Sequence, residues 1–141
     1  MALSIHYIIR RTDPERKADS AHVRILARKI GYTPAGFGFI AAQTQSTHTR
    51  RADGRLQRVT GKNKYVTVIT ILNNKMHAKV SCSCADFAYR WEVALEDRGS
   101  ADVEYSNGDQ PSITNPVLVP ACCKHLVALF NSVKSKLVPK T

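Results

Sequence analysis

The stretch that decides the fold runs from Tyr65 to Cys84 and reads YVTVITILNNKMHAKVSCSC. Its first eight residues are rich in β-branched side chains, which favour a strand. Asn73 and Asn74 then supply turn chemistry, because asparagine tolerates the left-handed backbone conformation. From Met76 to Cys82 apolar and polar residues alternate with the period of two that is typical of a half-buried strand. The stretch therefore predicts a β-hairpin over residues 65–82.

Two groups of potential metal ligands lie at and beyond the end of this hairpin. Cys82 and Cys84 end it, and Cys122-Cys123-Lys124-His125 opens a helix that we predict after Pro120. Zinc prefers four thiolate or imidazole ligands in a tetrahedron, and a helix N-terminus favours a thiolate. Three thiolates and one neutral imidazole would make a closed structural site. Free buried cysteines are the alternative, whereas the short separation within each pair disfavours a disulfide.

The spacing of these residues resembles the SWIM-type zinc finger, in which Cys-x-Cys, a variable gap and Cys-x-His lie on a β-hairpin and a following helix. The matching residues are Cys82, Cys84, Cys123 and His125, and the resemblance covers about residues 64–138. The gap of about 38 residues between the pairs is longer than is usual in the family. Cys122 is an alternative to Cys123 as a ligand, although the family spacing favours Cys123. The resemblance implies Zn²⁺ as the cofactor and the binding of DNA or proteins without catalysis.

Short motifs around the cysteines also resemble small SWIM-domain proteins that are encoded by tailed bacteriophages. These motifs are CSCADFAYR from Cys82, SNG from Ser106, Asn115-Pro116, and CKHL from Cys123. Such proteins are commonly unassigned or associated with virions. The resemblance implies a structural or assembly component that contacts other protein subunits, located in the virion or in the host cytoplasm.

The positive charge of the chain is unevenly placed. Its 141 residues include 21 Lys or Arg and 11 Asp or Glu, for a formal charge of +10, and residues 1–80 hold 15 of the basic and 4 of the acidic side chains. A one-sided basic field attracts acidic protein surfaces or phosphate backbones, although a solvated face without a partner is also common. Segment 47–64 predicts an exposed loop or a long hairpin tip. Its candidate residues for binding an anionic partner are Arg50, Arg51, Arg55, Arg58, Lys62 and Lys64.

Contact with neighbouring subunits through this basic region is the first hypothesis, and binding of DNA or RNA phosphates through loop 47–64 is the alternative. No aromatic residues interleave with the basic ones, which disfavours a platform for stacking bases.

Common catalytic and membrane motifs are missing from the sequence. No Walker phosphate loop and no Gly-x-Ser-x-Gly elbow is present. Asp86, Glu92, Glu96 and Asp97 have cap and helix-surface spacings, which favour solvated or capping roles over an acid–base pair. No apolar run approaches the roughly 20 residues that span a bilayer, and the N-terminus lacks the pattern of a secretory signal. We expect a non-enzymatic module that has no small-molecule substrate and is neither secreted nor membrane-bound.

These patterns predict one small α+β domain, with a zinc-stabilised hairpin-and-helix core and a basic N-terminal β/α extension. Residues 1–63 form the basic region, with a strand from Leu3 to Ile9, a helix from Asp13 to about Gly31 and a short strand from Phe37 to Ala42. Asp13 is a suitable helix N-cap and Pro14 a suitable first helical residue. The sequence leaves open whether residues 1–60 share the zinc-module core or form an arm, although so short a region is marginal alone.

The second region, residues 64–141, is the predicted zinc module. It contains an inserted helix that begins after Asp86 and a turn-rich excursion, both within residues 85–120. The last helix carries an apolar stripe at helical spacing, formed by Leu126, Leu129, Phe130, Val133 and Leu137.

Overall fold

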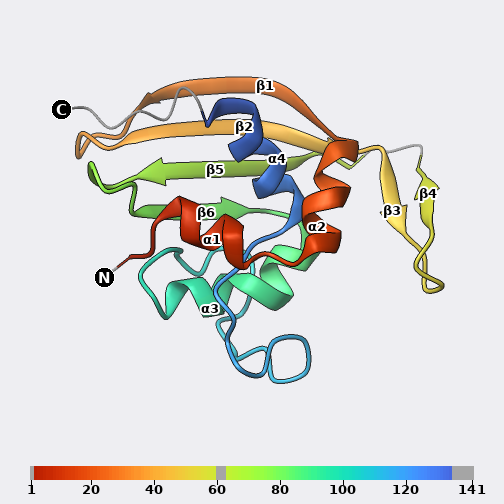
Figure 1. Cartoon of the computed structure of the whole chain (residues 1–141). Coiled ribbons are helices and arrows are strands. Elements are labelled where there is room, and N and C mark those ends of the chain that lie inside the picture. The colour runs from red at the N-terminus through yellow and green to blue at the C-terminus, as the bar shows by residue number, and fades with distance from the viewer. Residues whose placement is uncertain (1, 60–62, 135–141) are drawn as a thin grey trace.

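Four antiparallel strands form the main sheet of the protein, in the order β1-β2-β5-β6 (Figure 1). The structure is a computed structural model that describes residues 2–59 and 63–134. The four strands are β1 (Val23–Tyr32), β2 (Gly38–Ser46), β5 (Tyr65–Ile71) and β6 (Ala78–Cys82). Two short strands, β3 (His48–Arg50) and β4 (Leu56–Arg58), pair in a separate hairpin that extends beyond one end of the main sheet.

Helices α1 (Ile5–Arg11), α2 (Pro14–Asp19) and α4 (Lys124–Val133) lie on one face of the sheet, the near face in Figure 1. A 3-10 turn, η1 (Ser20–His22), follows α2, and the π-helical segment η2 (Phe87–Trp91) leads into α3 (Glu92–Glu96) beside β6. None of the helices in the described part of the chain has the length and apolar character needed to cross a membrane. The predicted α+β class is confirmed.

The predicted hairpin over residues 65–82 is confirmed. Strands β5 and β6 pair in antiparallel register from Thr67 opposite Cys82 to Ile71 opposite Ala78. Every second residue of β6 is buried, as the alternation predicted. The hairpin thus places Cys82 on the core side of the sheet, at the end of its last strand.

The last helix is also confirmed, and it begins at Lys124. The predicted stripe faces the core, because Leu126, Leu129 and Val133 are fully buried and Phe130 is nearly so. Leu137 lies outside the described residues. With this face packed on the core, the first residues of α4 lie next to the end of β6.

The predicted strand from Leu3 to Ile9 is wrong, because Ile5–Arg11 is helix α1. The hydroxyl of Ser4 caps this helix by accepting the backbone N–H of Tyr7 at 3.1 Å. Ile5 and Ile8 are both fully buried, and their spacing of three residues puts them on one helical face. The apolar run thus buries its side chains as a helix against the core.

The predicted helix from Asp13 begins as expected but ends much earlier. Asp13 accepts the backbone N–H of Arg16 at 3.0 Å, and Pro14 is the first helical residue. Helix α2 ends at Asp19, and the part of the predicted helix from Val23 onwards is strand β1. A bulge lies between Leu26 and Lys29 in this strand. The bulge interrupts the alternation of apolar residues, and the remaining pattern imitated helical spacing.

The remaining predicted elements need smaller changes. The short strand predicted from Phe37 to Ala42 is present as β2 and runs further, to Ser46. For segment 47–64 the sequence predicted either an exposed loop or a long hairpin tip, and the segment contains the β3–β4 hairpin. A helical segment follows Asp86, and residues 100–120 have no regular structure, as predicted.

Residues from both halves of the chain share one sheet and one core. Strand β2 pairs with β5 along seven residue pairs, which joins the N-terminal region to the hairpin. Ile5, Ile8 and Ile40 belong to the same buried cluster as the apolar residues of α4. The N-terminal region therefore contributes α1 and β2 to the core and is not a separate arm, whereas its β3–β4 hairpin extends beyond the main sheet (Figure 1).

The predicted solvated or capping role is wrong for Glu92. Its side chain is fully buried, and its carboxylate accepts the backbone N–H groups of Glu104, Tyr105 and Ser106 at 2.9 to 3.2 Å. Glu92 therefore anchors the irregular excursion to the helix before it.

Candidate metal centre

Four buried side chains form a group that could hold a metal ion: Cys82, Cys84, Cys123 and His125. One potential ligand atom from each residue lies within 4.8 Å of all the others. In a tetrahedron with zinc–sulfur bonds of about 2.3 Å, neighbouring sulfur atoms are about 3.8 Å apart. Small side-chain movements would therefore bring the four ligand atoms around one ion. The structure thus brings together the four residues that the sequence analysis selected.

The two ligand pairs come from elements that meet at one end of the sheet. Cys82 is the last residue of β6, and Cys84 lies just after it, where its sulfur accepts the backbone N–H of Phe87 at 3.4 Å. Cys123 is the N-cap residue of α4, and His125 lies in the first turn of that helix. The ends of β6 and α4 therefore face each other across the site.

The structure separates Cys122 from the group, although it is the neighbour of Cys123. Its sulfur lies 3.4 Å from Oγ1 of Thr12, and the same oxygen accepts the backbone N–H of Cys122. Burial raises the pKa of the Cys122 thiol to about 12, which favours a neutral thiol. The geometry therefore assigns Cys123 to the site.

The imidazole of His125 supports a metal ion at this position. Its Nε2 lies 2.8 Å from Oγ of Ser46. Its Nδ1 is the one buried side-chain nitrogen or oxygen atom in the described residues that has no hydrogen-bond partner. A buried polar atom without a partner costs about 1–3 kcal/mol, and a coordinate bond to a metal would remove this cost. The donor set and this atom both fit zinc.

The thiols influence one another strongly. Desolvation opposes a charge on Cys82, but hydrogen bonds from Cys123, Cys84 and Thr67 hold the pKa of Cys82 well below its usual value. Burial and the neighbouring Cys82 and Cys84 raise the pKa of Cys123 well above its usual value. Sulfur atoms this close cannot all be ionised without a cation among them. A bound divalent ion would supply that charge and displace the remaining protons.

A cavity of about 710 Å³ lies beside the centre and is bounded in part by Cys84, Cys123 and His125. Most of the charged side chains in its wall neutralise one another. Arg16 donates two hydrogen bonds to the carboxylate of Asp86, at 2.6 and 2.8 Å. Arg50 likewise contacts Asp19, with its shortest bond at 2.8 Å. The cavity wall therefore holds these ion pairs together with Lys124, whose ammonium donates to the backbone carbonyl of His48.

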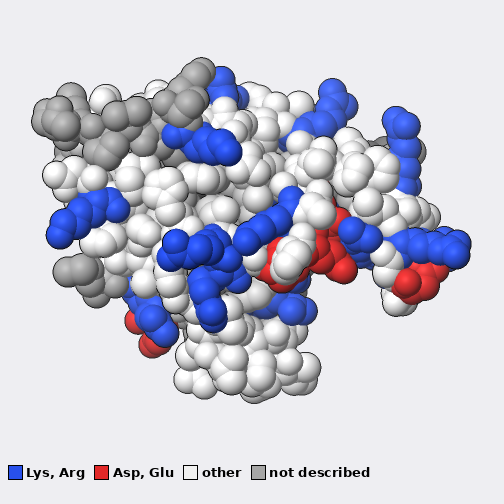
Figure 2. All heavy atoms as spheres, viewed as in Figure 1, with Lys and Arg blue, Asp and Glu red and all other residues white. Residues whose placement is uncertain are grey.

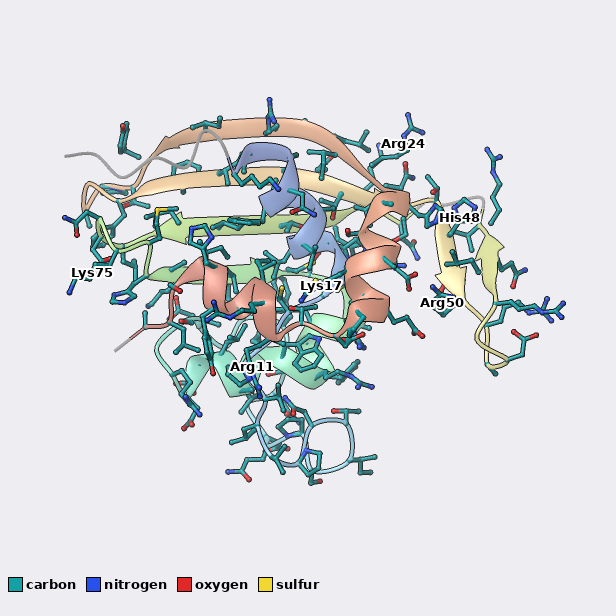
Figure 3. All side chains as sticks on the ribbon, in the orientation of Figure 1. Arg11, Lys17, Arg24, His48, Arg50 and Lys75 are labelled. Carbon is teal, nitrogen blue, oxygen red and sulfur yellow. The ribbon has the colours of Figure 1, made fainter. Side chains whose placement is uncertain are left out.

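The six predicted contacts for an anionic partner differ in their surroundings. Arg50 is bound to Asp19 and donates to the carbonyl of Gly54, so it holds the hairpin in place (Figure 3). Arg51 lies 3.6 Å from Asp53 in an exposed ion pair. Arg55, Arg58 and Lys64 are exposed and form no ion pair within the described residues, and Lys62 lies outside them.

The exposed basic side chains give the hairpin a positive surface. Figure 2 shows Lys and Arg side chains over the β3–β4 hairpin, at the right of the view, with a small acidic group below them and a larger one between the hairpin and the rest of the molecule. From the predicted set, the described residues that can contact an outside partner without breaking an ion pair are Arg55, Arg58 and Lys64.

The sequence analysis did not identify the hydroxyl groups that surround the ligands. Oγ1 of Thr67 lies 3.5 Å from the sulfur of Cys82, and Oγ1 of Thr44 lies 2.9 Å from Oγ1 of Thr67. Both threonines are fully buried at core-facing positions of β5 and β2. A polar residue at such a position in an alternating strand is a signal that could have indicated them. Ser46 has no comparable signal.

Comparison of the chain with protein-family models, with curated protein sequences and with solved structures finds no match. The site is therefore described by its own side chains, which form a buried group of three cysteines and one histidine that could hold a metal ion.

Proposed function

We propose that the protein is a non-catalytic binding module that zinc stabilises, and that it acts as an assembly component. In this proposal it contacts neighbouring protein subunits through its basic hairpin. The observation that carries the proposal is the buried group of Cys82, Cys84, Cys123 and His125. Four protein ligands fill the tetrahedron of zinc, so no position is left for a substrate or a reactive water. A site of this kind supports a structural role.

Zinc in this site would stabilise the fold by joining the end of β6 to the start of α4. Between these two ligand pairs the chain makes a long excursion, of which residues 100–120 have no regular structure, so the ion would link segments that are distant in the sequence and already packed in one core. The proposal keeps the SWIM-type class, which the resemblance of the ligand spacing suggests. The setting that we propose for the assembly, a tailed-bacteriophage virion, depends on that resemblance alone.

The β3–β4 hairpin supports the contact with a partner. Residues 51–58 are all exposed, and the hairpin extends beyond the main sheet (Figure 1). The pairing of Arg50 with Asp19 fixes its base against helix α2. A hairpin that is already held in place loses less conformational entropy on binding, which favours its use as a contact surface. Its free positive charges fit an acidic protein surface.

Binding of DNA or RNA is the second candidate function. The observation that favours it is that three exposed cations in and next to the hairpin, Arg55, Arg58 and Lys64, have no ion-pair partner within the described residues, and such side chains also fit phosphates. The hairpin carries no aromatic ring between Thr49 and Val59, so it offers no stacking contact to a base. Binding of this kind would be independent of nucleotide sequence.

A salt titration of binding to an arbitrary DNA duplex separates the two candidates. If three cations contact phosphates, the slope of log affinity against log salt is about −2.7, and affinity falls about 40-fold between 50 and 200 mM salt. We expect no measurable binding of folded, zinc-loaded protein at 50 mM salt, which supports protein assembly. A slope of about −2.7, measured with the same folded and zinc-loaded protein, would instead support the binding of nucleic acid through these cations.

A variant in which Arg55, Arg58 and Lys64 are all changed to alanine tests the hairpin, together with the segment that follows it, under either function. We expect this variant to keep its fold and to lose at least tenfold in affinity for the anionic partner, since it removes three exposed charges. Lys75→Ala is the matched control, because Lys75 is an exposed cation in the β5–β6 turn, far from the hairpin (Figure 3). Equal losses for Lys75→Ala and the triple variant would exclude the hairpin as the contact surface.

A further inference from the structure

We infer that Ser46 positions the histidine ligand of the metal centre, so that His125 binds the metal through Nδ1. This inference rests on the proposed zinc site and adds a residue outside the four ligands. Ser46 is the last residue of β2 and belongs to the N-terminal region, which supplies no ligand itself. The role of that region at the metal centre is to orient a ligand.

The two ring nitrogens of His125 have different surroundings. Nε2 lies 2.8 Å from Oγ of Ser46, whereas Nδ1 is buried without a partner. The two nitrogens of an imidazole point away from each other, so a ring with Nε2 on Ser46 turns Nδ1 away from that hydroxyl. A neutral imidazole carries one N–H, and its other nitrogen has the lone pair that binds a metal. With Nδ1 as the ligand, Nε2–H donates to Ser46.

The ring of His125 has little freedom to rotate away from this position. Its side chain is 4 % exposed, and the ring of Tyr65 packs against it with the ring centroids 4.9 Å apart. Tyr65 lies opposite Thr44 in the pairing of β5 with β2, and Ser46 is two residues further along β2 on the same face. The same strand pair therefore provides both the ring and the hydroxyl that confine the imidazole.

The same two strands also contact a cysteine ligand. The hydroxyl of Thr67 on β5 lies 3.5 Å from the sulfur of Cys82, and Thr44 on β2 lies 2.9 Å from that hydroxyl. A metal-bound thiolate only accepts hydrogen bonds, so Thr67 is the donor to Cys82. Such outer contacts fix the orientation of ligands, and their loss typically weakens metal binding 10–100-fold. Strands β2 and β5 thus form an outer shell for both ligand types.

Substitution at Ser46 tests the inference through the affinity for Zn²⁺, measured by competition with a chromophoric chelator. We expect Ser46→Ala to weaken zinc binding about 10–100-fold, because Nε2–H then loses its acceptor. Ser46→Thr keeps the hydroxyl, and we expect it to retain most of the affinity. Thr49→Ala is the matched control, since Thr49 is exposed and lines the same cavity without a contact to a ligand, and its affinity should be unchanged.

A second measurement uses the unaltered protein and so does not depend on how a variant folds. In the zinc-loaded chain, nitrogen-15 NMR of His125 should show a protonated Nε2 and a metal-bound Nδ1. A metal-bound Nε2, or an unchanged zinc affinity of Ser46→Ala, overturns the inference while the zinc site stands. A wild-type chain that binds no zinc overturns the proposed site and the inference together.

Discussion

Removal of zinc is expected to unfold the whole chain at 25 °C. A structural zinc site contributes about 10 kcal/mol at neutral pH, which is comparable with the entire stability of a typical domain, about 5–15 kcal/mol. The ligands come from β6 and α4, which belong to the one core that all strands of the main sheet share. Loss of the ion should therefore produce one cooperative transition that includes residues 1–60.

This expectation is measured by circular dichroism and metal analysis of the purified protein before and after addition of a strong chelator. The untreated chain should contain about one zinc ion. Cys84→Ser should have the effect of the chelator, whereas Cys122→Ser should cost only about 1–2 kcal/mol, since it alters a buried contact with Thr12. A metal-free chain with the same denaturation midpoint would contradict the zinc centre. A large loss of stability in Cys122→Ser together with a small loss in Cys123→Ser would show that the ligand assignment is wrong.

The second large effect is expected at Glu92, where alanine should lower the free energy of unfolding by about 3 kcal/mol. The buried carboxylate accepts three successive backbone N–H groups, from Glu104 to Ser106. Each hydrogen bond to a charged group contributes about 1.5–3 kcal/mol, and the cost of burying the carboxylate offsets part of the sum. Glu92→Gln should lie between wild type and alanine, because its amide retains only one acceptor oxygen.

Urea denaturation measures this loss, and amide hydrogen exchange at residues 104–106 shows where it arises. Exchange at these amides should accelerate strongly in Glu92→Ala. Glu96→Ala serves as the control, because Glu96 is an exposed acid on the same helix. Equal stabilities of the two alanine variants would mean that Glu92 does not anchor the excursion.

The parts of the fold that the sequence predicted well are those in which one side of an element is buried throughout. The hairpin over residues 65–82 combines a β-branched run in its first strand with strict alternation in its second, and α4 keeps its apolar side chains at helical spacing. The four residues of the candidate site were selected because the spacing of Cys82 and Cys84, and of Cys123 and His125, reflects local geometry. Local patterns of this kind depend little on distant parts of the chain.

The wrong predictions concern segments whose structure depends on tertiary contacts. Strand β1 has a bulge after Leu26, and only its pairing with β2 identifies it as a strand. The short helix α1 is stable because Ile5 and Ile8 are buried in the core. Ser46 contacts a residue 79 positions further along the chain, and Glu92 contacts residues 12 to 14 positions further along. No local sequence pattern could therefore have assigned their contacts.

The bulge in β1 also affects how copies of the chain can associate. An open sheet edge invites strand addition and fibre growth. Here the ladder of β1 is broken at Ala27, which has a φ of 43°, and the exposed cations Arg24, Arg28 and Lys29 repel a second basic edge. At the other edge, the backbone N–H groups of Ala78 and Val80 in β6 already donate to the carbonyls of Leu3 and Ser100. Both edges of the main sheet therefore disfavour main-chain pairing, which directs the association of copies through this sheet towards side-chain contacts.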